Sequence, residues 1–93
     1  MIRSFADRDT ERLWERLLVR RWGPVLGRAA YRKLLILDAA TSLNDLSATP
    51  GNRLEKLAGG YAGKYSIRIN SQWRVCFLWR DSDAYEVEIV DYH

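Results

Sequence analysis

The spacing of the apolar residues changes once along this chain, and that change limits the folds it can adopt. Up to about residue 40 the apolar residues recur with the period of a helix, whereas from Tyr65 onward they alternate with polar residues, as in strands. Helices followed by strands are typical of α+β domains, in which the helices cover one face of a sheet. The sequence therefore predicts an α+β fold, with two N-terminal helices packed on a small, mostly antiparallel sheet. Residues 1–93 are expected to form a single domain.

The first helix is expected close to the N-terminus. Residues 2–5 are predicted to form a short strand, after which Asp7 or Asp9 can cap a helix by accepting hydrogen bonds from its first free N–H groups. This helix would extend to about Arg21. Its buried stripe would consist of Leu13, Trp14, Leu17 and Leu18.

A second helix is expected from Pro24 to about Ala40. Trp22 and Gly23 interrupt the first pattern, and proline is favoured in the first turn of a helix. A tight turn would then join two antiparallel helices. The inner face of the second helix would consist of Ala30, Leu34 and Leu37, flanked by Ala29, Ile36 and Ala40.

Positive charge is concentrated in the region of these helices. The whole chain carries a formal net charge of +3, yet residues 16–33 contain six basic residues and no acidic residue. Such a surface is either an ordinary solvated helix face or a docking surface for an anionic partner. The sequence leaves both interpretations open.

Three strands are expected after residue 64. They cover residues 65–69, 73–79 and 85–89, with a turn at residues 70–72. Their register follows from matching the apolar faces, because a slip by one residue turns every side chain to the other face. The expected pairs are Tyr65 with Phe77, Ile67 with Val75, Ile69 with Trp73, Phe77 with Val87, and Trp79 with Tyr85.

The same register places Arg68 opposite Arg74 on the other face of the sheet, with Tyr92 nearby. Like charges directly across a strand pair are destabilising. Either Glu86 and Glu88 offset the repulsion between the two arginines, or the arginines together bind an anion. We favour the anion site.

Composition and motifs exclude several kinds of site. With one histidine and one cysteine the chain lacks the ligands of a typical zinc site, and it has no glycine-rich phosphate loop. Cys76 lies in a predicted strand, where cysteines are usually buried, so it makes a poor nucleophile. No metal and no cofactor are expected. The charged N-terminus is unlike a secretory signal and no apolar run could span a bilayer, which favours a cytoplasmic protein.

The remaining polar residues suit RNA cleavage without a metal. That reaction needs a base for the 2′-hydroxyl proton, cations for the phosphate charge and an acid for the leaving 5′-oxygen. Arg68 and Arg74 could supply the cations, and His93 is the one side chain of a type that titrates near neutrality, which suits the acid. The alternative is that His93 is only a mobile terminal residue.

Four segments carry a family resemblance: PGNRLE at residues 50–55, GKYSIRIN at 63–70, QWRVCF at 72–77 and VEIVDYH at 87–93. Through them the sequence resembles the HigB/GraT branch of the RelE/ParE toxin superfamily. The resemblance implies a RelE-like, microbial RNase-type fold. It also implies the toxin of a type II toxin–antitoxin pair, which enters the ribosomal A site and cuts mRNA by 2′-hydroxyl attack.

The resemblance implies site residues as well. Arg68 and Arg74 would bind the scissile phosphate, and Asp91, Tyr92 and His93 would form a catalytic C-terminal group.

One loop departs from the family pattern. Relatives place a histidine and a lysine before the strand that starts near residue 65, where this chain has Glu55 and Ala58. Glu55 would then act as the base, and Arg53, Lys56 and Lys64 would supply cations for the phosphates.

The expected partners follow from the same resemblance. They are a helix-turn-helix antitoxin of the HigA type, the ribosome and mRNA, with operator DNA bound only through the toxin–antitoxin complex. The ribosome would meet the basic helices through Arg12, Arg16, Arg20, Arg28 and Arg32. Two other interpretations stay open: a ParE-like inhibitor of DNA gyrase without nuclease activity, and an inactive RNA-binding domain held by its antitoxin.

Overall fold

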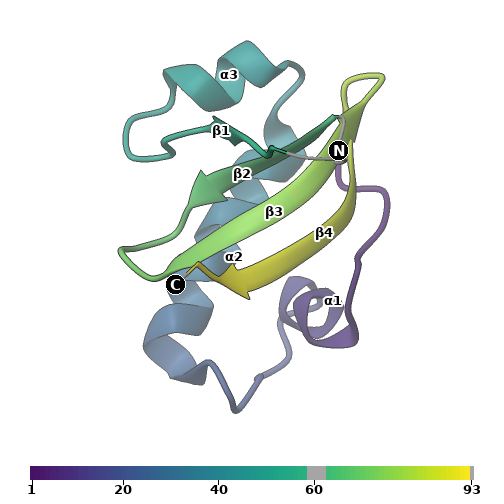
Figure 1. The fold of residues 1–93 in the computed structure, drawn as a ribbon. Coiled ribbons are helices and arrows are strands. Elements are labelled where there is room, and N and C mark those ends of the chain that lie inside the picture. Colours follow the sequence, from purple (N-terminus) through teal and green to yellow (C-terminus); the bar gives the residue numbers. More distant parts are fainter. Residues whose placement is uncertain (59–62, 93) are drawn as a thin grey trace.

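The computed structural model describes residues 1–58 and 63–92. Within them the elements are α1 (Arg8–Trp14), α2 (Gly23–Ala39), α3 (Leu43–Ala48), β1 (Glu55–Lys56), β2 (Lys64–Arg68), β3 (Trp73–Arg80) and β4 (Asp83–Asp91). The strands form one sheet in the order β1-β2-β3-β4, and all neighbouring strands are antiparallel. α2 crosses behind this sheet and α1 lies near β4 (Figure 1). The predicted α+β architecture is confirmed.

The core lies between the helices and one face of the sheet. Leu34 and Leu37 of α2 belong to one buried cluster with strand residues that alternate along the chain. These strand residues are Ile67, Val75, Phe77, Val87 and Ile89. The other face of the sheet, which carries Ser66 and Arg74, therefore points away from α2. None of the helices in residues 1–58 and 63–92 has the length and apolar content that crossing a membrane requires.

α1 begins where the sequence predicted. The Asp7 side chain accepts a hydrogen bond from the Thr10 N–H at 3.4 Å and thereby caps the helix. The buried Thr10 hydroxyl in turn accepts a hydrogen bond from the Ile89 N–H at 3.2 Å. This bond fixes the first turn of α1 on β4.

The prediction that this helix extends to Arg21 is wrong. Arg16 adopts a left-handed backbone conformation with φ 66°, and the N–H groups of Arg16 and Leu17 donate to carbonyls of the last helical turn at 2.9 and 3.0 Å. This is the Schellman arrangement, which terminates a helix. Residues 15–22 form a linking segment instead of a tight turn. On it, Leu17 and Leu18 of the predicted buried stripe are 51% and 72% exposed.

α2 confirms the second predicted helix. It spans Gly23–Ala39, with Pro24 in its first turn. Ala30, Leu34 and Leu37, the predicted inner face, are fully buried.

Residues 2–5 do not form a full strand of the sheet. They make only two isolated parallel bridges, Ile2 with Ala84 and Phe5 with Val87. The N-terminus nevertheless runs parallel to β4, and four backbone hydrogen bonds join residues 1–6 to Ala84 and Val87.

The register between β2 and β3 is the predicted one, with Tyr65 opposite Phe77 and Ile67 opposite Val75. β3 and β4 keep the predicted register only as far as Cys76. Beyond it, Glu86 adopts a φ of 51° and inserts an extra residue into β4, which is a β-bulge.

The bulge corrects two predicted pairs. Trp79 pairs with Ala84 instead of Tyr85. Phe77 was predicted to pair with Val87 but lies opposite the bulge, between the regular pairs of Cys76 and Leu78. Ala84 is therefore fully buried, whereas Tyr85 leaves the core face and lies beneath the Arg80 guanidinium.

Candidate active site

Arg74 lies on the sheet face opposite the helices and is nearly buried, at 6% exposure. Its Nε donates to the Ser66 hydroxyl at 2.8 Å, and its Nη2 donates to the carbonyls of Arg53 and Ser66. A buried charge is costly unless hydrogen bonds satisfy it. These bonds also fix the plane of the guanidinium, so Arg74 is a positioned cation rather than a mobile surface charge.

β1 brings a carboxylate to this cation. The sequence did not predict β1, whose register places Glu55 opposite Ser66 of β2. The Glu55 Oε1 lies 3.8 Å from the Arg74 Nη1, while the Glu55 side chain stays 50% exposed. The carboxylate of this ion pair is therefore open to solvent, whereas the guanidinium is nearly buried.

Tyr92 completes what we call the Arg74 cluster: Arg74, Glu55 and Tyr92. The Arg74 guanidinium carbon lies 5.3 Å from the centre of the Tyr92 ring. The Tyr92 hydroxyl lies 3.5 Å from the Glu55 Oε2, longer than a typical hydrogen bond between oxygens, with the phenol on the donor side. A fixed cation, a carboxylate and a phenol therefore converge from β3, β1 and the end of β4.

The end of β4 is tied to the turn before β3. The Tyr92 N–H donates to the Gln72 carbonyl at 2.7 Å, and the Gln72 amide donates to the Asp91 carboxylate at 2.9 Å. These bonds hold Tyr92 over the guanidinium. Asp91 pairs with Trp73, so the alternation along β4 places its side chain on the opposite face from Arg74. His93, the predicted acid, lies outside the described residues.

Arg68 lies directly opposite Arg74, as the register predicted. Near it, Lys33 of α2 donates from its Nζ to the Asn52 side-chain oxygen at 2.7 Å. Burial, with the charges of Arg68 and Arg32, lowers the pKa of Lys33. Positive charge is therefore concentrated beside Arg68, where Lys33 and Arg32 also lie.

Contrary to one interpretation of the sequence, Glu86 and Glu88 do not offset the repulsion between Arg68 and Arg74. The carboxylate beside Arg74 is Glu55, and neither Glu86 nor Glu88 forms an ion pair with either arginine in the described part of the chain. Within residues 1–58 and 63–92, Arg68 forms no ion pair. The excess of positive charge is what an anion site requires.

Two residues that support the site were missed by the sequence analysis, Ser66 and Asn52. Asn52 is fully buried; its amide donates to a carbonyl of α3 at 3.1 Å, and its own carbonyl accepts the Arg68 N–H at 2.6 Å. It thereby fixes the loop in which Arg53 presents its carbonyl to Arg74. The strand alternation, which puts Ser66 on the arginine face, was the available signal for Ser66.

The predicted phosphate-binding cations occupy different positions. Arg53 is exposed next to the Arg74 cluster, in a left-handed conformation with φ 45°. Lys64 lies on the same face of β2 as Ser66, because every second side chain of a strand points to the same face. Lys56 follows Glu55 directly in β1, so the alternation turns it to the opposite face.

The arginines predicted to meet the ribosome are all exposed, but they do not form one helical row. Arg12 lies on α1, and Arg28 and Arg32 lie on α2. Arg16 and Arg20 lie on the segment between the helices.

Cys76 is a buried residue without a catalytic environment. Burial, more than any neighbouring charge, raises the pKa of its thiol to about 11. The thiol is therefore protonated at neutral pH, and a protonated thiol is a weak nucleophile. In residues 1–58 and 63–92 no cluster of three histidine, cysteine or acidic side chains could hold a metal ion.

Comparison with known proteins supports the resemblance seen in the sequence. The model of a family described as the RelE-like toxin of the type II toxin–antitoxin system HigB matches residues 3–93. Toxin HigB-1 of Vibrio cholerae serotype O1 is 42% identical over 85 residues, covering 90% of this chain and 90% of that toxin. Endoribonuclease HigB of Proteus vulgaris is 29% identical over 99 residues, covering 100% of both chains.

A solved structure shares the fold. A chain of the YoeB–YefM complex from Staphylococcus aureus superposes with a TM-score of 0.63 at 18% identity, covering 100% of this chain and 98% of that one. At this identity the likeness concerns the fold alone. Together with the family match, it confirms the predicted RelE-like architecture.

Proposed function

Because the chain belongs to the HigB-like family of RelE-like toxins from type II toxin–antitoxin systems, we propose that it acts as a ribosome-dependent mRNA endonuclease. The relative from Proteus vulgaris is named an endoribonuclease. The Arg74 cluster offers this chain groups that RNA cleavage without a metal requires. The substrate would be mRNA in the ribosomal A site.

The observation that carries the proposal is the fixed Arg74 guanidinium with Glu55 at 3.8 Å. Glu55 would take the proton of the 2′-hydroxyl, whose oxygen attacks the adjacent phosphorus. The bond from phosphorus to the 5′-oxygen breaks, that oxygen receives a proton from His93, and a 2′,3′-cyclic phosphate remains. Arg74 would stabilise the charge that grows on the phosphate oxygens.

Other residues would hold the RNA around the scissile phosphate. Tyr92 is 47% exposed and offers a ring on which a base can stack. Arg68, Lys64 and Arg53 would contact the flanking phosphates. Asp91 would act as a positioning residue, because it holds the chain end through Gln72.

The partners we propose are an antitoxin with a helix-turn-helix domain, the ribosome and, through the complex, operator DNA. The family description supports an antitoxin. The ribosome would be met by the exposed arginines of the helical side: Arg12, Arg16, Arg20, Arg28 and Arg32. The site of action would be the cytoplasm, where mRNA is translated.

Primer extension on a defined mRNA during translation in vitro tests the proposal. We expect cuts within codons for the natural chain, and none without ribosomes. Arg74→Lys, which keeps the charge but loses the forked geometry, and His93→Ala should abolish the cuts. Arg8→Gln, a change at an exposed residue of α1, is the matched control and should cut normally.

Two results would overturn the proposal. Intact message in every reaction, together with inhibition of DNA gyrase supercoiling, would identify a ParE-like inhibitor. Salt-dependent RNA binding without cut products would identify an inactive RNA-binding domain.

A further inference from the structure

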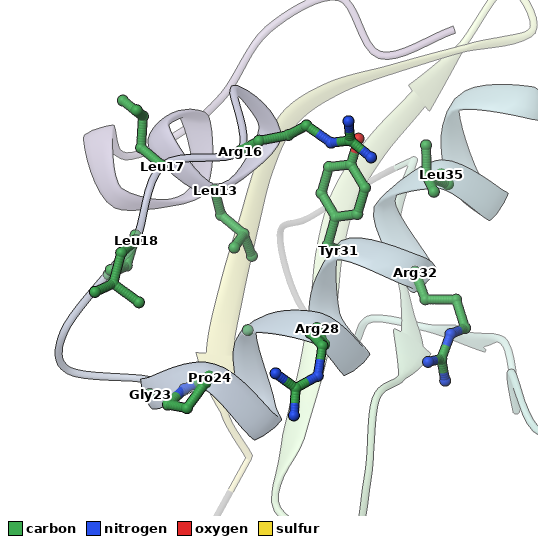
Figure 2. A pocket seen from close by; sticks show the side chains of 12 residues that line it. Leu13, Arg16, Leu17, Leu18, Gly23, Pro24, Arg28, Tyr31, Arg32 and Leu35 are labelled. Carbon is green, nitrogen blue, oxygen red and sulfur yellow. The ribbon is translucent and has the colours of Figure 1, made fainter.

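A groove opens on the helical side of the molecule, between α1, the segment of residues 15–22 and α2. It has a volume of about 520 Å³. Figure 2 shows Leu17 and Leu18 on the segment and Leu35, Arg28 and Arg32 on α2. Since α2 packs on the Ile67 face of the sheet, the groove and the Arg74 cluster lie on opposite sides of the sheet.

The apolar lining of the groove is exposed to solvent. Leu17, Leu18 and Leu35 are 51%, 72% and 45% exposed. Leu17 and Leu18 reach the surface because the left-handed Arg16 ends α1 before them. Clustered exposed leucines around a concave surface are typical of a site where another chain binds.

The charges at the rim are unbalanced. Arg28 and Arg32 form no ion pair within residues 1–58 and 63–92, whereas Arg21, just outside the groove, contacts Asp7 and Asp9. The Arg16 guanidinium lies 5.4 Å from the centre of the Tyr31 ring, which also lines the groove. A partner that fits here must combine aliphatic side chains with acidic ones.

We propose that this arginine-rimmed groove docks an acidic amphipathic segment of the antitoxin. The inference rests on the proposed function, because it takes the chain to be a toxin with an antitoxin partner. Aliphatic side chains on one face of the segment would pack against Leu17, Leu18 and Leu35. Aspartates or glutamates at the edges of that face would pair with Arg28 and Arg32.

The chemistry of the groove favours this occupant over two others. In a symmetric dimer, a second copy would bring a second set of arginines to the groove and no compensating acid from residues 16–33, which contain none. RNA would satisfy the arginines but would leave the leucines against sugar and phosphate. Only an acidic amphipathic peptide satisfies both parts of the surface.

Calorimetric titration of the full chain with its cognate antitoxin, at low and at high salt, tests the proposal. We expect Leu18→Asp and Leu35→Asp each to weaken binding by about tenfold or more. Arg28→Glu combined with Arg32→Glu should weaken it similarly and reduce its salt dependence. All four residues are exposed, so the variants should keep the thermal midpoint of the natural chain.

Matched controls lie close to the groove. Val25 of α2 is 74% exposed but does not line it, so Val25→Asp should bind the antitoxin normally. Arg8→Glu reverses a charge on α1 outside the lining and should also be silent. Hydrogen exchange should slow on antitoxin binding in residues 16–35.

Several outcomes would overturn the inference. Unchanged antitoxin affinity in the groove variants, without protection of residues 16–35, would place the antitoxin elsewhere. A dimer of the chain alone that Leu18→Asp dissociates would assign the groove to a second copy. Failure of the proposed function gives a different result from failure of this inference. In that case the natural chain would cut no mRNA, while antitoxin binding would still depend on Leu18 and Leu35.

Discussion

Arg74 and Glu55 approach to 3.8 Å between Nη1 and Oε1, but only one of them is held in place. Arg74 makes three hydrogen bonds to Ser66 and the Arg53 carbonyl, whereas Glu55 is half exposed. In the mechanism that we propose, Arg74 would therefore keep its orientation when a phosphate binds and would exchange the carboxylate for the phosphate. The released carboxylate would then be free to accept a proton.

Glu55→Gln should separate catalysis from stability. Loss of a general base costs about 10²-fold to 10⁴-fold in rate, so cleavage by ribosome-bound enzyme should fall by at least about 10²-fold. A half-exposed ion pair contributes about 1 kcal/mol or less, so the free energy of unfolding should change little. Single-turnover cleavage and urea denaturation measure the two quantities. An unchanged cleavage rate would remove Glu55 from the mechanism.

Ser66→Ala should disturb the position of Arg74, although Ser66 itself has no contact with substrate in the proposed mechanism. It removes the 2.8 Å hydrogen bond to the guanidinium Nε, and bonds to charged groups contribute about 1.5–3 kcal/mol. We expect a loss of that size in the free energy of unfolding and slower cleavage. Ser71→Ala, at an exposed turn position, is the control. Equal effects of the two changes would show that Ser66 does not hold Arg74.

The strand pattern made the centre of the site predictable. Alternation of apolar residues set Ile67 opposite Val75, and that register alone placed Arg68 opposite Arg74. Ser66 and Asn52 were missed because short polar side chains show their role only through tertiary contacts. β1 was missed because two residues are too few to show a period.

Two of the errors in the predicted fold, the length of the first helix and the register of β4, share one cause. Arg16 ends α1 and Glu86 makes the bulge, both with positive φ and neither a glycine. Glycine is the usual sequence signal for such conformations. The helical spacing of the leucines also continues past Arg16, so tertiary packing overrode a local pattern.

Asn52→Ala should destabilise the loop that supports Arg74. The change leaves a buried carbonyl of α3 and the Lys33 ammonium without their partner, and one unsatisfied buried group costs about 1–3 kcal/mol. We expect about 2 kcal/mol or more of lost stability in urea denaturation. Asn44→Ala, at an exposed position of α3, should be nearly neutral. Similar losses in both variants would contradict the role of Asn52.

Cys76 should make stability depend on pH at alkaline values. Its thiol pKa is raised from 9.0 to about 11 in the folded chain. Between these values the unfolded chain releases the proton while the folded chain retains it, so stability falls as pH rises. The urea midpoint of the natural chain should drop more steeply across this window than that of Cys76→Ala. Parallel curves would mean that the thiol titrates normally when folded.

Glu86→Gly should stabilise the chain, because the bulge in β4 holds residue 86 at a positive φ. Glu86 holds a φ of 51°, which costs a residue other than glycine about 1–2 kcal/mol. Glycine avoids this cost but loses more entropy on folding, so a net gain of about 0.5–1 kcal/mol is expected. The Glu86 N–H that donates to the Ser4 hydroxyl at 2.9 Å is backbone and is retained. Glu88→Gly, at a regular strand position opposite Cys76, should instead lose about 0.5–1 kcal/mol. Thermal denaturation of the two variants therefore distinguishes a bulge at Glu86 from a regular strand, in which both glycines would destabilise β4 alike.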